Sequence, residues 1–236
     1  MEKSINIFII HLRKNTDRYD YIQNGIKNSN INANFHIWDA WDGNNINTDK
    51  TLSKYFSKVW SYRRYKNVKA IAGQKGCLLS HIQCMNYCLK HNINNAIILE
   101  DDVDFSKLNN NSFNVPTQAT GIYYLGSSLQ VKGQSTNYIL PIIEKPVLLD
   151  TSRYKLWGTY GYYLLDISNI YNKLLLYSPC SIDVMFTRFI QPTNKIYYIN
   201  IILTNTIFKS DVTFTEKYRK KIRPIFNLKM NKLKEL

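Results

Sequence analysis

The sequence lacks any long apolar run. No stretch reaches the roughly 18 consecutive apolar residues that a membrane-spanning helix needs. The first twelve residues also lack the basic segment, the apolar segment and the small-residue cleavage site of a secretory leader. We therefore expect a cytoplasmic protein. Cysteine is scarce as well, with Cys77, Cys84, Cys88 and Cys180 only, and in that compartment these four residues fit reduced thiols better than a disulfide framework.

Several motifs of phosphate and acyl chemistry are missing. The chain contains neither G-x-x-x-x-G-K-[ST] nor a G-x-G-x-x-G that follows a strand, which argues against kinase-like and dinucleotide-binding enzymes. It contains no serine nucleophile elbow either. There is no internal repeat and no linker rich in Pro, Gly and Ser. We predict one domain over residues 1–215, followed by a basic C-terminal extension over residues 216–236.

Acidic residues are in short supply. The chain has 17 Asp and Glu against 31 Lys and Arg, for a formal net charge of +14. This excess indicates an anionic partner, such as a nucleic acid, a nucleotide-linked substrate or an acidic membrane surface. Positive charge is concentrated at residues 50–69 and 217–234. Because apolar residues are interspersed in the second segment, we predict peripheral contact there with an anionic membrane or with an anionic acceptor, with a disordered solubilising tail as the alternative.

The hydrophobic pattern predicts alternating strands and helices. Residues 5–12 and 96–99 are short runs rich in isoleucine, as is typical of buried strands. Further strands are expected within residues 35–43, 121–127, 137–149 and 155–165. Helical spacing is present in residues 18–27, 76–91 and 166–177, the last with Ser168 as its expected N-cap. This alternation predicts an α/β domain with a mostly parallel central sheet.

Four of the few acids follow one apolar run directly. In "NAIILEDDVDF", residues 95–105, a strand is followed by Glu100, Asp101, Asp102 and Asp104. In an open α/β sheet, ligands bind outside the carboxyl ends of the strands. Carboxylates held close together repel one another unless a cation offsets the repulsion, and their oxygens suit Mg²⁺ or Mn²⁺. The run predicts a site for Mn²⁺ or Mg²⁺, with a solvated acidic turn as the alternative.

A second set of metal-binding residue types recurs on one predicted helix. Cys77, His81, Cys84 and Cys88 lie at helical spacing. The first and last of them are about 16 Å apart along a helix, so four ligands on this one rigid helix cannot surround one tetrahedral ion. A stripe of small apolar thiols that faces the core explains the spacing better. His81 is then either a core histidine or a residue that faces the site.

A cation beside a basic surface is compatible with two enzyme classes. One is a metal-dependent nuclease or nucleotidyltransferase, and the other is a glycosyltransferase whose metal holds the diphosphate of a sugar nucleotide. Seven sequence blocks bear on the choice, and in chain order they are "RKNTDR" (13–18), "WDAWDG" (38–43), "GQKGCLLSH" (73–81), "AIILEDDV" (96–103), "IYYLG" (122–126), "WGTYGYYLL" (157–165) and "SIDVMF" (181–186). Together they resemble glycosyltransferase family 25, which contains lipooligosaccharide and collagen galactosyltransferases.

The resemblance implies a fold and a reaction. The fold is the GT-A type nucleotide-sugar fold, which is Rossmann-like. The reaction is inverting transfer of a hexose, galactose or glucose, from a UDP-sugar to a hydroxyl of a glycan, lipooligosaccharide or protein acceptor, with Mn²⁺ or Mg²⁺ as cofactor. No nucleic acid partner is expected under this resemblance. The alternatives are the nuclease or nucleotidyltransferase and a catalytically inactive module that keeps the fold and binds its ligand.

The resemblance also implies roles for individual residues. Asp102 is the expected metal ligand, and Asp104 is assigned to the same metal site. Asp183 in "SIDVMF" is the expected general base, which removes a proton from the acceptor hydroxyl. The residues expected around the nucleotide sugar are Arg13, Arg18, Gly43, Glu100, Asp101, Gly158 and Thr159.

Overall fold

The computed structural model describes residues 4–45, 68–105, 120–134, 137–139, 145–177, 180–199 and 223–224. Most of the basic stretch at residues 50–69 and nearly all of the predicted extension at residues 216–236 lie outside this set. The predicted domain boundary and the predicted membrane contact therefore stay predictions. Within the described residues, no helix combines the length and the apolar character that a membrane span requires.

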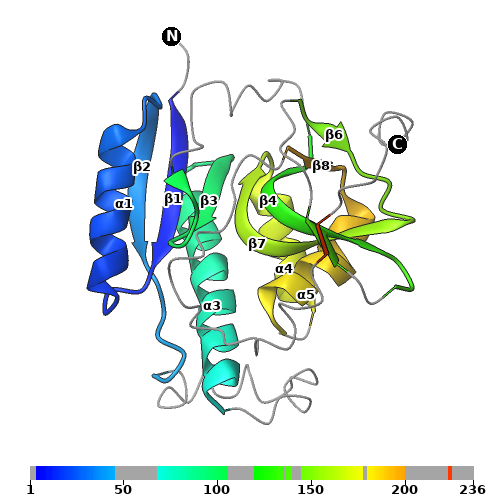
Figure 1. Cartoon of the computed structure of the whole chain (residues 1–236), viewed down its shortest axis with the longest axis horizontal. Coiled ribbons are helices and arrows are strands. Elements are labelled where there is room, and N and C mark those ends of the chain that lie inside the picture. Colours follow the sequence, from blue (N-terminus) through cyan, green and yellow to red (C-terminus); the bar gives the residue numbers. More distant parts are fainter. Residues whose placement is uncertain are drawn as a thin grey trace.

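The described chain alternates strands and helices in its first half and is rich in strands in its second half (Figure 1). The first elements are β1 (Ile5–His11), α1 (Thr16–Asn28), β2 (Ala33–Asp39), α3 (Val68–Lys90) and β3 (Ala96–Glu100). The later strands are β4 (Ile122–Val131), β5 (Asn137–Ile139), β6 (Val147–Leu148), β7 (Tyr154–Leu164), β8 (Ile196–Tyr198) and β9 (Arg223–Pro224). The later helices are α4 (Ile167–Leu176) and α5 (Ile182–Met185), and α5 continues as a π-helical turn (Phe186–Ile190) and a 3₁₀ turn (Gln191–Thr193).

The strands form one sheet in the order β2-β1-β3-β7-β4-β5-β9, and β8 pairs with both β4 and β6. Strands β2, β1 and β3 are parallel, whereas β7 runs antiparallel to both of its neighbours, β3 and β4. Among the described strands, four of the eight pairings are parallel. The α/β class is confirmed, and the prediction of a mostly parallel sheet is wrong.

The physical reason for this error lies in β4 and β7. Parallel neighbours need a long crossover, which is usually a helix, and no helix is described between these two strands. Both strands are buried along most of their length, and β7 reads as the near-continuous apolar run that buried parallel strands also show. Strand direction therefore cannot be recognised from hydrophobicity here.

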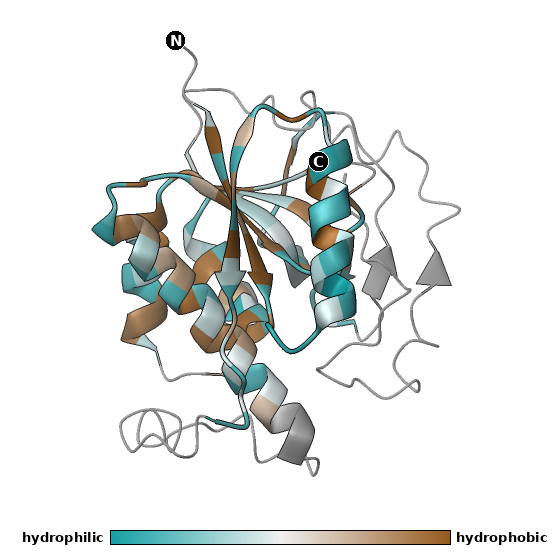
Figure 2. Cartoon of the chain, turned by 90° about the vertical axis from the view of Figure 1, so that its left-hand side faces the viewer, coloured by the Kyte–Doolittle hydropathy of each residue, from teal (hydrophilic) through white to brown (hydrophobic). Residues whose placement is uncertain are grey.

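The sheet separates two apolar layers. Alternate side chains of the parallel strands point to opposite faces, so that Phe8 and Ile98 pack with α3 and α4, while Ile9 and Leu99 pack with Ile22 of α1. Figure 2 shows largely apolar strands in the middle of the molecule and helices with apolar and polar residues on different faces. The N-cap of helix α4 is Asp166, two residues before the predicted Ser168, and its carboxylate accepts a hydrogen bond from the backbone N–H of Asn169 at 3.0 Å.

The parallel half of the sheet places three strand ends together. In the pairing register, Ile10 of β1 lies opposite Glu100 of β3, and His11 lies opposite Asp39 of β2. The segments that follow β1, β2 and β3 therefore start from one edge of the sheet. This edge carries the acidic run that the sequence singled out.

Candidate active site

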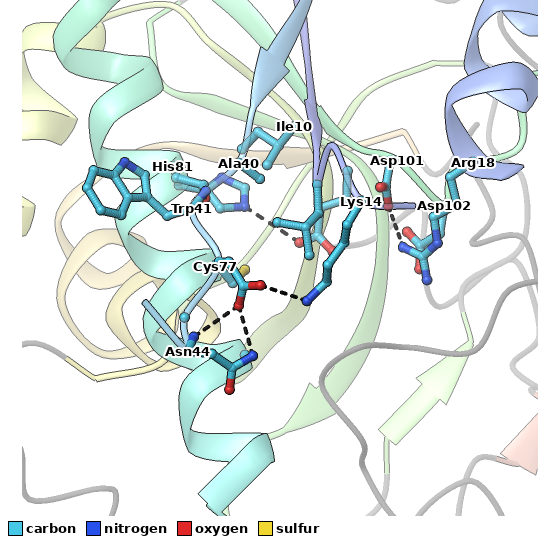
Figure 3. Close-up of a pocket in the computed structure, with 16 residues that line it drawn as sticks. Ile10, Lys14, Arg18, Ala40, Trp41, Asn44, Cys77, His81, Asp101 and Asp102 are labelled. Carbon is cyan, nitrogen blue, oxygen red and sulfur yellow. Dashed lines mark hydrogen bonds and ion pairs between the residues drawn. The ribbon is translucent and has the colours of Figure 1, made fainter. Parts of the chain in front are cut away.

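A cavity of about 380 Å³ lies at this edge (Figure 3). Its walls come from the segment after β1, the turn after β2, one face of α3, and the acids after β3. This volume is within the range of small-molecule sites in proteins. Glu100, Asp101 and Asp102 all line it, as do Arg18 and Gly43, so the structure brings together five of the residues predicted from sequence.

The turn after β2 lies directly against α3. A Cβ atom on Gly43 would clash with the backbone carbonyl of Ala72, and one on Gly76 would lie 2.5 Å from the carbonyl oxygen of Trp41. The backbone N–H of Trp41 also donates to the hydroxyl of Ser80 at 2.9 Å. Gly43 lines the cavity, and close backbone packing is the reason that a glycine is needed there. Its contact with the nucleotide sugar stays a prediction.

Lys14 and Asp42 were not singled out in the sequence, although both line the cavity. The Lys14 ammonium donates to Asp42 Oδ2 at 2.8 Å, and the backbone N–H of Asn44 donates to Asp42 Oδ1 at 3.0 Å. These hydrogen bonds lower the pKa of Asp42, and the one from Lys14 has the largest effect. The signal that could have identified both residues is their position just after a strand end, which is where the acidic run was found.

Asp101 is at the centre of a buried charge cluster. Arg18 of α1 donates from Nη1 to Asp101 Oδ1 at 2.5 Å, and His11 Nδ1 lies 3.0 Å from Asp101 Oδ2. All three side chains are buried. Both carboxylate oxygens therefore already have partners within the chain. The geometry favours Asp101 as the residue that ties α1, β1 and β3 together, and its predicted contact with the nucleotide stays a prediction.

Asp102 and Glu100 differ from Asp101 in having too few partners. Asp102 Oδ1 is buried and has no hydrogen-bond partner. Burial, and then repulsion by Glu100 and Asp101, raises the pKa of Asp102 to about 7. Burial also raises the pKa of Glu100 to about 7, although a hydrogen bond from Thr159 opposes the rise. The positive charge of Arg18 opposes both rises but does not cancel them. Asp104, which was assigned to the same metal site, is partly buried and does not line the cavity.

A bulge in β7 brings Thr159 to Glu100. Ser128 of β4 pairs with Trp157, while Gly126 pairs with Gly161, so one residue of β4 lies opposite three residues of β7. The bulge begins at Gly158, whose φ of +98° favours glycine and whose added Cβ would clash with the ring of Tyr160. The positive φ and the clash explain why residue 158 is a glycine, and its contact with the nucleotide sugar stays a prediction.

The Thr159 hydroxyl bridges two acids. It lies 3.1 Å from Glu100 Oε1 and 3.2 Å from Asp183 Oδ1, and its single proton can be donated to only one of them at a time. Burial, and then repulsion by Glu100, raises the pKa of Asp183 to about 6, while hydrogen bonds from Thr159 and from the backbone of Gly158 oppose the rise. The cavity-lining residues do not include Gly158, Thr159 or Asp183. They do include Glu100, which accepts the hydrogen bond from Thr159 and so connects this group to the cavity.

Arg13 lies apart from this arrangement. Its side chain is 84% exposed, pairs with Asp39 at 2.8 Å, and does not line the cavity. Nothing in the geometry brings Arg13 to the acids, in contrast to Arg18.

The thiol stripe on α3 is divided between two environments. Cys84 and Cys88 are buried in the core, as the sequence predicts, whereas Cys77 is partly exposed and lines the cavity. His81 also lines the cavity and is fully buried, which lowers its pKa to about 4. Its Nδ1 lies 2.5 Å from the hydroxyl of Tyr162, and its Nε2 faces Glu100 Oε1 at 3.6 Å.

Comparison with known families identifies the chain. Residues 4–178 match the model of glycosyltransferase family 25, described as an LPS biosynthesis protein family. The chain belongs to glycosyltransferase family 25. The matched residues of this family 25 chain include the cavity, the acidic run and the bulge in β7, whereas Asp183 lies beyond them. Membership of the family makes the protein a transferase by class.

Two curated relatives are similar to part of this family 25 chain. Procollagen galactosyltransferase 2 of Mus musculus and that of Homo sapiens are each 28% identical to it over 100 residues. That segment is 42% of this chain and only 16% of either relative. The activity, substrates and partners of the whole relatives therefore do not transfer directly.

Proposed function

We propose that this protein is an inverting hexosyltransferase of the GT-A type, which transfers galactose or glucose from a UDP-sugar to an acceptor hydroxyl and uses Mn²⁺ or Mg²⁺. The observation that carries the proposal is the buried Asp102 Oδ1, which has no hydrogen-bond partner and belongs to an acid that lines the cavity at the strand ends.

The parallel half of the sheet supports the proposal that the UDP-sugar donor binds in the cavity at the strand ends, which we call the donor end. Strands β2, β1 and β3 with α1 and α3 resemble a Rossmann-like half, in which a nucleotide binds beyond the carboxyl ends of the strands. The cavity lies at those ends. Arg18 and Lys14 add positive charge to its wall, and Gly43 allows the backbone to come close. Arg13 has the weakest support among the proposed donor contacts, because it is exposed and paired with Asp39.

The acids after β3 fit a divalent cation. Asp102 and Glu100 offer hard oxygen donors, and the unpartnered Oδ1 of Asp102 lacks the stabilisation that a buried carboxylate needs. Asp104 is proposed to support the same ion. A bound Mn²⁺ or Mg²⁺ would stabilise the negative charge that grows on the departing diphosphate.

Asp183 is proposed to remove the proton from the acceptor hydroxyl. With a pKa raised to about 6, it is mostly ionised at neutral pH and still accepts a proton more readily than an exposed aspartate does. The Thr159 hydroxyl lies within hydrogen-bond distance of both Asp183 and Glu100 and can donate to either, which places the base beside the acids of the cavity. A glycan, a lipooligosaccharide or a protein is the proposed acceptor class, in line with the family description and with the names of the two relatives.

A panel of sugar nucleotides tests the proposal. The protein is incubated with Mn²⁺ and UDP-, GDP- and ADP-linked hexoses, and free nucleoside diphosphate is measured. We expect release of UDP from UDP-galactose or UDP-glucose, loss of release in a chelator, and loss of release in Asp102→Asn. The matched control is Asp150→Asn, which alters an exposed acid in a turn far from the acidic run in sequence. No release from any donor, with UDP binding retained, would indicate an inactive binding module instead.

A further inference from the structure

Three metal-binding side chains meet beside the acidic run. Cys77 and His81 lie one turn apart on α3, and Glu100 ends β3. One ligand atom from each of them lies within 4.8 Å of the other two. All three side chains line the cavity, so the cluster has access to a ligand from that side. Four residues of one rigid helix cannot surround an ion, but in this cluster the third donor, Glu100, comes from the sheet.

The His81 Nε2 atom gives the second observation. His81 has no exposed surface, and its Nε2 makes no hydrogen bond. The other ring nitrogen, Nδ1, is engaged by the hydroxyl of Tyr162 at 2.5 Å. Metal-binding histidines commonly use one ring nitrogen for the ion and the other for such a partner. Thr159 fixes Glu100 in the same way, through a hydrogen bond at 3.1 Å.

We propose that Cys77, His81 and Glu100 form a second cation site, which shares Glu100 with the site proposed at Asp102 and takes a borderline-soft divalent ion such as Zn²⁺. Zinc binds thiolate, imidazole and carboxylate together, and sites with three protein ligands leave a fourth position open. Bond lengths of about 2.0 to 2.3 Å put the donor atoms of a tetrahedral ion roughly 3.3 to 3.6 Å apart. The 3.6 Å between His81 Nε2 and Glu100 Oε1 is at the upper end of this spacing, and all three donor atoms lie within 4.8 Å of one another.

The donor set separates this site from the one at Asp102. Mn²⁺ and Mg²⁺ prefer oxygen ligands, whereas a thiolate selects softer ions. The three donors all belong to this chain, so the ion can bind whether or not the proposed transfer reaction takes place. Glu100 belongs to both sites, so an ion in the cluster removes Glu100 from the donor end of the cavity.

Cobalt titration tests the site directly. The tag-free protein is stripped with a chelator and titrated with Co²⁺, which replaces zinc and absorbs light according to its ligands. We expect one equivalent to bind with a thiolate-to-cobalt charge-transfer band that Zn²⁺ abolishes and excess Mg²⁺ does not. In Cys77→Ser the band should vanish and the affinity should fall roughly tenfold or more. The controls Cys88→Ala, a core thiol on the same helix, and His91→Gln, an exposed imidazole, should keep the band.

Two results would overturn the inference. One is a wild-type spectrum without a thiolate band, and the other is a Cys77→Ser variant that binds Co²⁺ as the wild type does. Circular dichroism and a melting curve show whether Cys77→Ser is folded. A second measurement uses the unmodified chain, in which Cys77 is the partly exposed cysteine and the other three are buried. Zn²⁺ should slow alkylation of Cys77 severalfold, as read by peptide mapping, and an unchanged rate contradicts the site. Both measurements omit the sugar donor, so a failed transfer assay leaves them interpretable.

Discussion

Arg18 donates a 2.5 Å hydrogen bond to Asp101 in a buried ion pair, although 83 residues separate the two in sequence. Removing one partner of a buried pair leaves the other charge without compensation, which costs about 3 to 5 kcal/mol. Asp101→Asn should therefore lower the melting temperature of the ligand-free protein by roughly 2 to 4 °C for each kcal/mol lost.

The exposed pair of Arg13 and Asp39 is the matched control. Because both side chains are more than half exposed, Asp39→Asn should change the free energy of unfolding by less than about 1 kcal/mol. Thermal or denaturant unfolding measures both variants. Equal effects of the two substitutions would show that Asp101 does not tie the elements together.

Asp183→Asn tests the proposed base. The amide cannot accept the proton from the acceptor, so the transfer rate should fall by about 10² or more, while donor affinity changes little. Steady-state kinetics and UDP binding separate the two quantities. An equal loss of UDP affinity would instead place Asp183 on the nucleotide or its metal.

The pH dependence of transfer follows from the same carboxylate. Asp183 acts as a base only when ionised, and its pKa is raised to about 6, so kcat/KM should be retained above pH 6 and fall as the pH drops through about 6. The Thr159 hydroxyl lowers this pKa. Thr159→Val keeps the shape of the side chain without the hydroxyl, and should move the acid limb of the profile to higher pH. Thr159→Ser should leave the limb near its wild-type position. A limb that does not move in Thr159→Val would show that this hydrogen bond does not tune the base.

Gly158→Ala tests whether the bulge in β7 needs glycine. Alanine is unfavourable there for two reasons: the φ of +98° strains a residue with a side chain, and the added Cβ would clash with the ring of Tyr160. Gly133 is a matched control, because its φ is also positive, at +85°, but a Cβ there would meet nothing within 4 Å. Gly133→Ala should cost about 1 kcal/mol of unfolding free energy from backbone strain alone. Gly158→Ala should cost more and should also reduce transfer, because Thr159 is the next residue. Equal stability loss and full activity would contradict the role of the bulge.

Local sequence signals predicted the elements and the acidic run well, since these depend on periodicity and on position within one segment. The run after β3 was recognised because acids rarely follow an apolar strand in such a basic chain. The direction of β7 was not predictable, because a strand buried on both faces reads alike in parallel and antiparallel sheets.

The hydrogen-bond partners of the acids could not be predicted from the sequence, for a different reason. Asp101 and Asp102 are adjacent and chemically identical, yet one is saturated by Arg18 and His11 and the other has an oxygen with no partner. That difference arises from contacts across 80 residues or more. The bridge from Thr159 to Asp183 depends in turn on a bulge that only strand register reveals.

The central claim is that Asp102 holds a divalent cation at the donor end. Because its buried Oδ1 has no partner and its neighbours repel it, Asp102→Asn should leave the metal-free protein as stable as the wild type or slightly more so. With Mn²⁺ and UDP at a hundredfold excess over the dissociation constant, the wild type should gain about 2.7 kcal/mol. The deciding measurement is the shift in melting temperature that Mn²⁺ with UDP produces in the two proteins. The account predicts a clear shift in the wild type and little or none in Asp102→Asn. A metal-free Asp102→Asn protein that melts many degrees lower, with its ligand-induced shift intact, would contradict it.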